Sequence, residues 1–200
     1  MIDKNFLRHA REFIRHIRNF KYEMSPEGIL FPQAAAVAGG EYFYDSNGER
    51  PGRAENLLPV ESFNYLLEAG LRGGSSTSAF YLALFGNATT PDENSKASTF
   101  ATDYGEFTSG SSGYSENTRR PWLAEPASGG KMDNLDNRAS FSIVAQGQLT
   151  IRGAALLSDP TKGGGDGVLI SVARFPNSEV QSNGSVFNLG YRVRLRQPNL

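Results

Sequence analysis

The sequence predicts a mainly β protein, an antiparallel and jelly-roll-like β-sandwich with an N-terminal amphipathic helical arm and one short additional helix. From residue 79 onward, short apolar segments alternate with turns rich in Gly, Asn, Asp and Pro, without a helical pattern between them. The chain has 200 residues with 38% apolar residues and 22 Gly, which suits a turn-rich β domain better than a helical bundle. Thirteen Phe and eight Tyr supply enough apolar surface for a core.

Residues 1–24 are predicted to form the arm, with a helix over residues 3–21. On a helical wheel its apolar face comprises Phe6, Leu7, Ala10, Phe13, Ile14, Ile17 and Phe20. A basic ridge beside that face comprises Lys4, Arg8, Arg11, Arg15 and Arg18. Residues 1–21 hold six Lys/Arg against two Asp/Glu, whereas the remaining residues hold fourteen against nineteen. A positive arm is therefore attached to a negative body.

The arm has three possible uses. Its apolar face could pack on the chain's own body with the ridge in water, or it could dock on a neighbouring subunit with the ridge facing an acidic partner. Binding to a membrane surface is disfavoured, because the arm has no Trp and no lipidation motif. His9 and His16 flank the apolar face and are too far apart for one metal ion. The arm residues assigned to partner binding are Phe6, Leu7, Arg8, Arg11, Phe13, Ile14, Arg15, Ile17 and Arg18.

Residues 25–56 are predicted to be an extended linker with a hairpin, because "EYFYDSNGER" reads as a strand that reaches an Asn47-Gly48 turn. The sandwich domain is expected over residues 57–200. A leading helix over 60–71 begins after Pro59 and ends at Gly73-Gly74. Its apolar stripe comprises Val60, Phe63, Leu66, Leu67 and Leu71.

Six segments are predicted to be strands of the sandwich: 79–85, 105–110, 139–145, 148–157, 167–175 and 186–196. The polar stretch that follows Phe85, "GNATTPDENSKASTF", shows no apolar periodicity. We expect it to be a surface loop that reaches over a neighbouring subunit.

Few residues suggest chemistry. The chain has no Cys, which excludes disulfides, cysteine-based zinc sites and thiol catalysis, and both of its His lie on the arm. "GGGDG" at 163–167 lacks the Lys-Ser/Thr of a phosphate-binding loop and is predicted to be a flexible hairpin loop. "DSNGE" at 45–49 and "DNLDN" at 133–137 are predicted to cap turns rather than bind calcium. No pair of acids stands out for a hydrolase, so we expect no catalytic residue, metal or cofactor.

The segment "YSENTRRPWLAEP" at 114–126 carries the only Trp. Tyr114, Arg119, Arg120 and Trp122 could form an aromatic and basic patch that binds a partner, and we assign them to partner binding. In the alternative interpretation, Trp122 after Pro121 closes an edge of the sandwich. Arg119 or Arg120 then pairs with Glu106 or Glu116.

Five segments in order, "LLPVESFNYLLEAGLRGG", "FYLALFGNATTP", "YSENTRRPW", "IRGAALLS" and "GVLISVARF", resemble small virion proteins of tailed bacteriophages. In that family a short helix leads through a Gly-Gly turn into a "WYxALF"-type strand, a "YTEATRPxW"-like segment, an "xGAxL" strand and an "L…ARF" strand. The resemblance covers residues 57–176. Arg120 is an additional basic residue in the third segment, and the basic arm over residues 1–21 departs from the family.

The resemblance implies a structural role. Expected partners are other virion proteins, namely capsid, portal, neck or tail subunits, and further copies of the chain related by particle symmetry. Capsid decoration or cementing is favoured over a neck, collar or tail position. The expected location is the virion, after synthesis in the cytoplasm of the host bacterium. A net charge of −1 gives no reason to expect nucleic-acid binding. The alternative is a carbohydrate- or receptor-binding module of a phage tail, which would use Trp122, Tyr42 and Tyr44.

Overall fold

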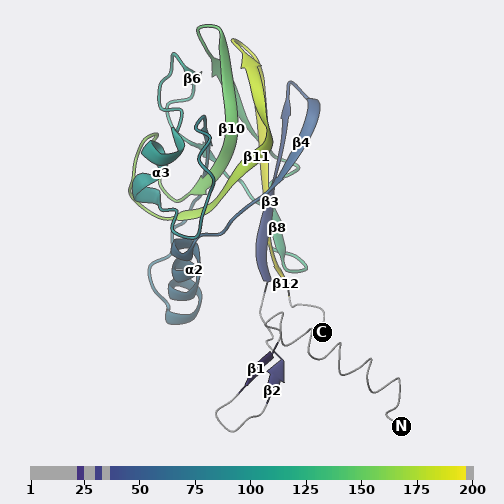
Figure 1. Cartoon of the computed structure of the whole chain (residues 1–200), viewed down its shortest axis with the longest axis vertical. Coiled ribbons are helices and arrows are strands. Elements are labelled where there is room, and N and C mark those ends of the chain that lie inside the picture. The colour runs from purple at the N-terminus through teal and green to yellow at the C-terminus, as the bar shows by residue number, and fades with distance from the viewer. Residues whose placement is uncertain (1–21, 25–29, 33–36, 197–200) are drawn as a thin grey trace, which may run out of the picture. The chain divides into compact units, whose positions relative to one another are not determined.

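The computed structural model describes residues 22–24, 30–32 and 37–196 (Figure 1). The chain divides into two units, residues 1–37 with 196–200 and residues 38–195. In the first unit, β1 (Tyr22–Met24) pairs antiparallel with β2 (Leu30–Pro32). The predicted arm helix over 3–21 lies outside the described residues. The second unit, residues 38–195, is called the body below.

The body contains two antiparallel sheets, which confirms the mainly β prediction. The six-stranded sheet has the order β4-β3-β12-β9-β6, with β8 paired to β12. Its strands are β3 (Val37–Ser46), β4 (Glu49–Glu55), β6 (Gly113–Tyr114), β8 (Lys131–Asp133), β9 (Ala139–Val144) and β12 (Val186–Arg196). The four-stranded sheet has the order β11-β10-β5-β7. Its strands are β5 (Tyr81–Phe85), β7 (Arg120–Pro121), β10 (Gln148–Leu157) and β11 (Leu169–Ser182).

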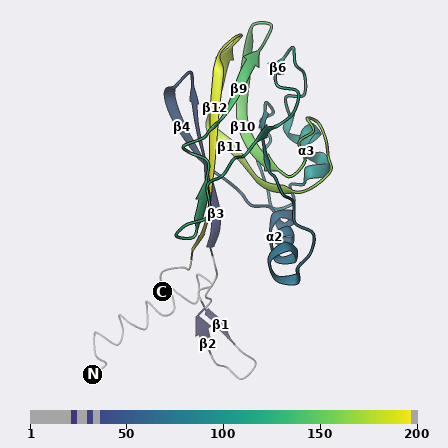
Figure 2. The same cartoon turned by 180° about the vertical axis from the view of Figure 1, so that it is seen from behind.

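One core joins the two sheets, which lie side by side in both views (Figure 1, Figure 2). Tyr44 of β3 stacks on Phe175 of β11 with ring centroids 4.1 Å apart. The hydroxyl group of Tyr42 is hydrogen-bonded to Ser171 of β11. Burial raises the pKa of Tyr42 well above its usual value, because an ionised phenol would lose its hydration. Two sheets that share a core in this way are arranged as in a β-sandwich.

The hairpin β3–β4 belongs to the body and corrects the predicted linker over 25–56. The turn at Asn47-Gly48 is present as predicted, with both residues at positive φ. However, Tyr42 and Tyr44 alternate with outward-facing residues and fill the core between the sheets. The body therefore begins at residue 38 rather than at residue 57.

A second cluster of apolar residues lies on the outer face of the four-stranded sheet, under α3 (Ala97–Tyr104). Phe85 of β5 meets Phe100 at 6.0 Å and Tyr104 at 5.1 Å between ring centroids. Because β5 is buried on both faces, its sequence reads as a continuous apolar run. The loop prediction for residues 86–100 is therefore wrong from Ala97 onward. The apolar positions 97, 100 and 104 have helical spacing but are separated by polar residues.

The other predicted elements divide into two groups. The segments 79–85, 139–145, 148–157, 167–175 and 186–196 each contain a strand, and β11 continues to Ser182. The segment 105–110 does not form a strand. Glu106 makes only an isolated bridge to Phe85, and its side chain forms an ion pair described below.

The predicted helix over 60–71 is confirmed as α2 (Val60–Leu67), continued by a π-helical turn, η1 (Glu68–Arg72). Gly73 ends it at φ 69°, a left-handed conformation that Gly adopts without strain. The carboxylate of Glu61 accepts hydrogen bonds from the N–H groups of Ala97 at 2.9 Å and Leu169 at 2.8 Å. The first turn of α2 is thus fixed to α3 and to β11. Among the described helices, none combines the length and the apolar character that crossing a membrane requires.

Replacing Phe100 by Ala should lower the free energy of unfolding by about 3–5 kcal/mol, because it empties the space between α3 and β5. Urea denaturation measures this change. The matched control is Thr99→Ala, an exposed position on the same helix, which should change stability by less than about 0.5 kcal/mol. Equal effects of the two substitutions would contradict the packing of α3 on the sheet.

Candidate functional site

The predicted patch at residues 114–122 is divided between the interior and the surface. Tyr114 and Arg119 are fully buried, so the assignment of these two residues to partner binding is corrected. Arg120 and Trp122 are half-buried and lie on or beside β7, the edge strand of the four-stranded sheet. The alternative interpretation is confirmed in two respects: Trp122 lies at a sheet edge, and Arg119 pairs with Glu106.

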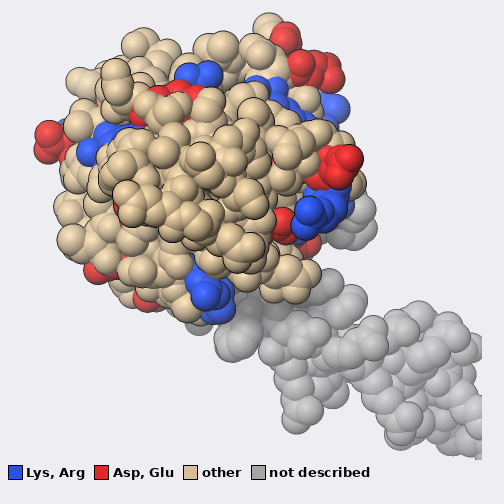
Figure 3. Space-filling model, turned by 90° about the horizontal axis from the view of Figure 1, so that it is seen from above, with Lys and Arg blue, Asp and Glu red and all other residues tan. Residues whose placement is uncertain are grey.

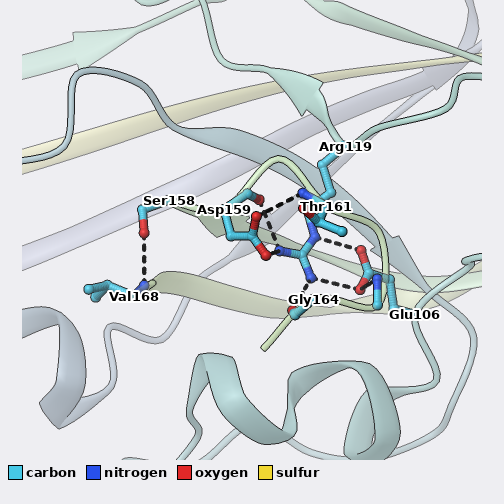
Figure 4. Close-up of polar contacts among 8 residues, drawn as sticks. Glu106, Arg119, Ser158, Asp159, Thr161, Gly164 and Val168 are labelled. Carbon is cyan, nitrogen blue, oxygen red and sulfur yellow. Dashed lines mark hydrogen bonds and ion pairs between the residues drawn. The ribbon is translucent and has the colours of Figure 1, made fainter. Parts of the chain in front are cut away.

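The guanidinium group of Arg119 holds a buried polar cluster together (Figure 4). Its Nε lies 2.7 Å from Oε1 of Glu106, and its Nη2 lies 2.8 Å from Oε2. It also donates to the carbonyl oxygens of Asp159 at 2.9 Å and Gly164 at 2.8 Å. A buried charge is tolerated only where it is paired and hydrogen-bonded, and Arg119 satisfies both conditions.

The Gly-rich loop between β10 and β11 is held by this cluster rather than flexible. Glu106 accepts a hydrogen bond from the N–H of Gly163 at 2.9 Å. At the base of the loop, Ser158 accepts one from the N–H of Val168 at 2.8 Å (Figure 4). Lys162 donates to the carbonyl oxygen of Tyr114 and lies 3.6 Å from the centre of its ring, and partial burial lowers the pKa of Lys162. The sequence predicted the loop but not its attachment.

A row of four aromatic rings leads from α2 to the six-stranded sheet: Tyr65, Phe80, Trp122 and Tyr191. Successive ring centroids are 6.1, 6.4 and 5.7 Å apart. The indole Nε1 of Trp122 donates to the side chain of Asn134 and to the carbonyl oxygen of Tyr191, each at 3.1 Å. The hydroxyl of Tyr65 accepts from the N–H of Thr77. Because the Trp122 indole N–H and the Tyr65 hydroxyl form hydrogen bonds within the protein, the remaining surface of these rings is apolar.

This row lines a groove of about 490 Å³ between α2–η1 and the β8–β12 end of the six-stranded sheet. Lys131 is the charged residue that lines it. The other lining residues are Ala38, Leu58, Tyr65, Leu66, Ala69, Gly70, Phe80, Trp122, Ala127, Gly130, Met132, Leu156, Ile170, Tyr191, Val193 and Leu195. Such an apolar concavity at the surface is typical of a binding site. It is called the groove below.

The outer side of α2–η1 continues this apolar surface. Four side chains at helical spacing, called the α2 stripe, are exposed: Val60, Phe63, Leu67 and Leu71. Leu71 is 83% exposed and Leu67 is 55% exposed. Leu66, 42% exposed, connects the stripe to the groove. Contiguous apolar surface of this kind is typical of interaction sites. The sequence predicted the stripe, but not that it faces away from the core.

One wall of the groove is stiffened by an ion pair between β8 and β12. Nε of Arg192 lies 2.8 Å from Oδ2 of Asp133, next to the lining residues Met132 and Val193. Desolvation by itself would raise the pKa of Asp133. The hydrogen bond and charge of Arg192 outweigh it, so the pKa lies below the usual value near 3.8.

The other candidates contribute no further site. Asp45 accepts from the N–H of Gly48, and Asp133 accepts from that of Leu135, so both acidic motifs cap turns as predicted. Within residues 22–24, 30–32 and 37–196, no three His, Cys, Asp or Glu side chains gather as metal ligands. Tyr42 and Tyr44 are buried, which removes them as glycan-stacking residues. The nine assigned residues of the arm, from Phe6 to Arg18, lie outside the described part of the chain, as do His9 and His16.

Charged side chains are distributed differently between the arm and the body. The body holds thirteen Lys/Arg and seventeen Asp/Glu, whereas residues 1–21 carry an excess of four positive charges. At the end of the body away from α2, charges of both signs are scattered among uncharged residues (Figure 3). The net charge therefore differs between residues 1–21 and the body, whereas positive and negative side chains are mixed at this end of the body.

No protein-family model matches the chain, and no curated protein matches it. The groove, the α2 stripe and the sequence motifs therefore carry the functional proposal.

Replacing Arg119 by Met should lower the free energy of unfolding by about 3–5 kcal/mol, because the Glu106 carboxylate is left buried without its partner. The double variant Arg119→Met with Glu106→Leu should lose less than the sum of the single changes, with a coupling of about 1–3 kcal/mol. Urea denaturation of the four proteins measures the cycle. Arg120→Met, at the neighbouring half-buried arginine, is the control and should change stability by about 1 kcal/mol or less. Additive losses would contradict direct pairing.

In Arg192→Gln the pKa of Asp133 should rise, because desolvation remains while the compensating charge is lost. The depressed pKa stabilises the folded wild type at pH above about 3.8, and this contribution disappears as the pH falls through the folded-state pKa. The variant should therefore lose stability at neutral pH but not at strongly acid pH. An NMR titration of the side-chain carboxyl carbon measures the pKa. Arg194→Gln on the same strand, whose nearest acid is Glu41, should leave it unchanged.

Proposed function

We propose that the chain is a structural component of a tailed-phage virion that binds neighbouring capsid or neck subunits through its N-terminal arm and its loops. Capsid decoration or cementing is favoured over a neck, collar or tail position. In this proposal the two sheets form a jelly-roll-like sandwich, and the protein is made in the cytoplasm of the host bacterium and located in the virion. Catalytic, metal-binding and cofactor-binding residues are not assigned.

The single observation that carries the proposal is the exposed apolar surface of the α2 stripe and the groove. Where nothing covers it, this surface lies in water at an energetic cost of about 25 cal/mol for each Å². Burial against another subunit recovers that free energy, and it needs neither a reactive group nor a cofactor. Residues 57–176 resemble phage virion proteins, and the subunits of a virion are repeated by symmetry. The resemblance therefore supports neighbouring virion subunits as the partners.

The glycan-binding alternative has less support. A sugar site needs polar groups that reach the hydroxyls of the ligand, in addition to an aromatic surface. The aromatic row beside the groove has an exposed apolar face, but Trp122 Nε1 already donates to Asn134 and Tyr191. The groove is therefore better suited to an apolar protein segment than to a carbohydrate.

The direct test is whether the chain sediments with the virion particles of the phage that encodes it, purified from an infected bacterial culture. Reversing Arg11 and Arg15 to Glu should weaken this association, since the positive ridge would then repel an acidic partner. Association of the wild type should fall with added salt, because exposed charges are screened within about 8–10 Å at ordinary ionic strength. The matched control reverses two exposed charges of the body, Lys96→Glu with Arg174→Glu, and should bind particles as the wild type does.

Particle binding that ignores both the arm reversal and the salt would contradict the role of the ridge. Absence of the wild-type chain from purified particles would contradict the structural role itself.

A further inference from the structure

The α2 stripe is an exposed apolar helix face whose residues are spaced symmetrically about Leu67. Phe63 lies four residues before Leu67, and Leu71 lies four residues after it. We propose that the α2 stripe pairs with the α2 stripe of a second copy of this chain, in an antiparallel two-fold contact centred on Leu67. This inference rests on the proposed function, in which a neighbouring subunit covers the apolar surface, and it names that subunit as another copy of the chain.

The spacing of the stripe makes it complementary to itself. In a two-fold contact the same surface of both copies meets, so every contact between two different positions occurs twice. Phe63 and Leu71 lie roughly 5–6 Å from Leu67 along the helix, in opposite directions. When two such helices run antiparallel, Leu67 meets Leu67, and Phe63 of each copy lies level with Leu71 of the other.

The charged residues of α2–η1 have partners within their own chain. Glu61 accepts hydrogen bonds from the N–H groups of Ala97 and Leu169. Glu68 pairs with Arg72 at 3.0 Å on the same helix. A partner that recognises charge therefore finds no unpaired charge on this helix, whereas two copies can meet on it without repulsion between like charges. The second copy offers the same apolar, charge-paired surface.

The position of α2–η1 leaves room for a second copy. The helix extends beyond the two sheets in both views (Figure 1, Figure 2). Its inner side, at Tyr65 and Ala69, lines the groove, and the exposed Leu66 lies between the groove and the stripe. Pairing through the stripe therefore leaves the groove open to other virion subunits.

The exposed area corresponds to a small interface. A large apolar side chain that is fully exposed presents roughly 150–250 Å², so the exposed fractions of the stripe and of Leu66 amount to roughly 400–700 Å² in each copy. Two copies together bury roughly 800–1,400 Å², which overlaps the lower end of the range of about 1,200–2,000 Å² for specific interfaces. We therefore expect a dimer that forms and dissociates with protein concentration.

Disulfide trapping tests the pairing in the full chain, because the chain contains no Cys. Helix axes about 10 Å apart, with Cα atoms about 2.3 Å from each axis, put the two Cα atoms at position 67 about 5 Å apart. A disulfide spans about 4.4–6.8 Å between Cα atoms, so Leu67→Cys should form a covalent homodimer on mild oxidation. Thiols held together by pairing react at a high effective concentration.

The matched control is Val180→Cys, an exposed apolar position of β11 outside the stripe. Leu67→Cys should give about tenfold more homodimer than this control. Because both positions are about half-exposed, neither substitution should change the stability of the fold much, which urea denaturation checks. Equal yields from the two variants would overturn the pairing.

A second pair of variants tests the direction of the helices. Phe63→Cys and Leu71→Cys are placed in chains with different tags, mixed and oxidised. The antiparallel contact should give bridges between positions 63 and 71, which mass spectrometry locates. An excess of bridges that join position 63 to 63 and position 71 to 71 would overturn the antiparallel arrangement.

The effect of salt separates this contact from the charged ridge of the arm. The yield of the Leu67→Cys homodimer should not fall as salt is added, because the contact is apolar and screening weakens only interactions between charges. A yield that falls with salt would overturn the apolar contact.

The outcome is separable from that of the proposed function. Wild-type chains that enter virion particles, while Leu67→Cys gives no more homodimer than the control, leave the structural role intact and overturn this inference. Specific trapping through position 67 in a chain that is absent from purified particles supports the pairing and overturns the virion role.

Discussion

The position of α2 depends on the carboxylate of Glu61, which accepts hydrogen bonds from the first N–H of α3 and from the first N–H of β11. Both N–H groups lie at the beginning of an element, where the backbone has no internal partner for them. One side chain therefore fixes the first turn of α2 at the junction of α3 and the four-stranded sheet. The later turns project beyond the sheets beside the β8–β12 end (Figure 1). The groove and the outward direction of the α2 stripe both follow from this attachment.

The body departs from the usual distribution of side chains in two places: an ion pair is buried beside the apolar core, and an apolar surface is exposed. Arg119 and Glu106 are buried, and they hold the loop between β10 and β11 against the edge of the four-stranded sheet. Trp122, three residues further on, continues from the edge strand β7 to the groove. The segment "YSENTRRPW" that contributes to the phage resemblance thus has a structural role at its Arg and a surface role at its Trp. A buried ion pair is weak evidence for stability, but it does fix a unique arrangement of the loops around it.

A structural subunit of a particle needs surfaces that are incomplete until a neighbour arrives. Among the described residues, the α2 stripe and the groove are exposed apolar surfaces of the kind that the proposed role requires. By sequence, residues 1–21 and the body also carry opposite net charges. Exposed apolar surfaces suit assembly from repeated subunits, as the proposed function requires.

The sequence by itself determined the mainly β class, five of the six strand segments, the helix after Pro59 and the turn at Asn47-Gly48. These features depend on local periodicity and on turn residues, which can be read along the chain. It missed α3, because only positions 97, 100 and 104 face the sheet and the residues between them are polar. It also placed Tyr42 and Tyr44 in a linker, because their partner strand β12 lies more than 140 residues away. Only the tertiary structure decided whether each apolar face points toward the core or toward solvent. A stripe of Leu and Phe on a helix has the same sequence whether it faces a core or water, and contacts distant in sequence select between the two.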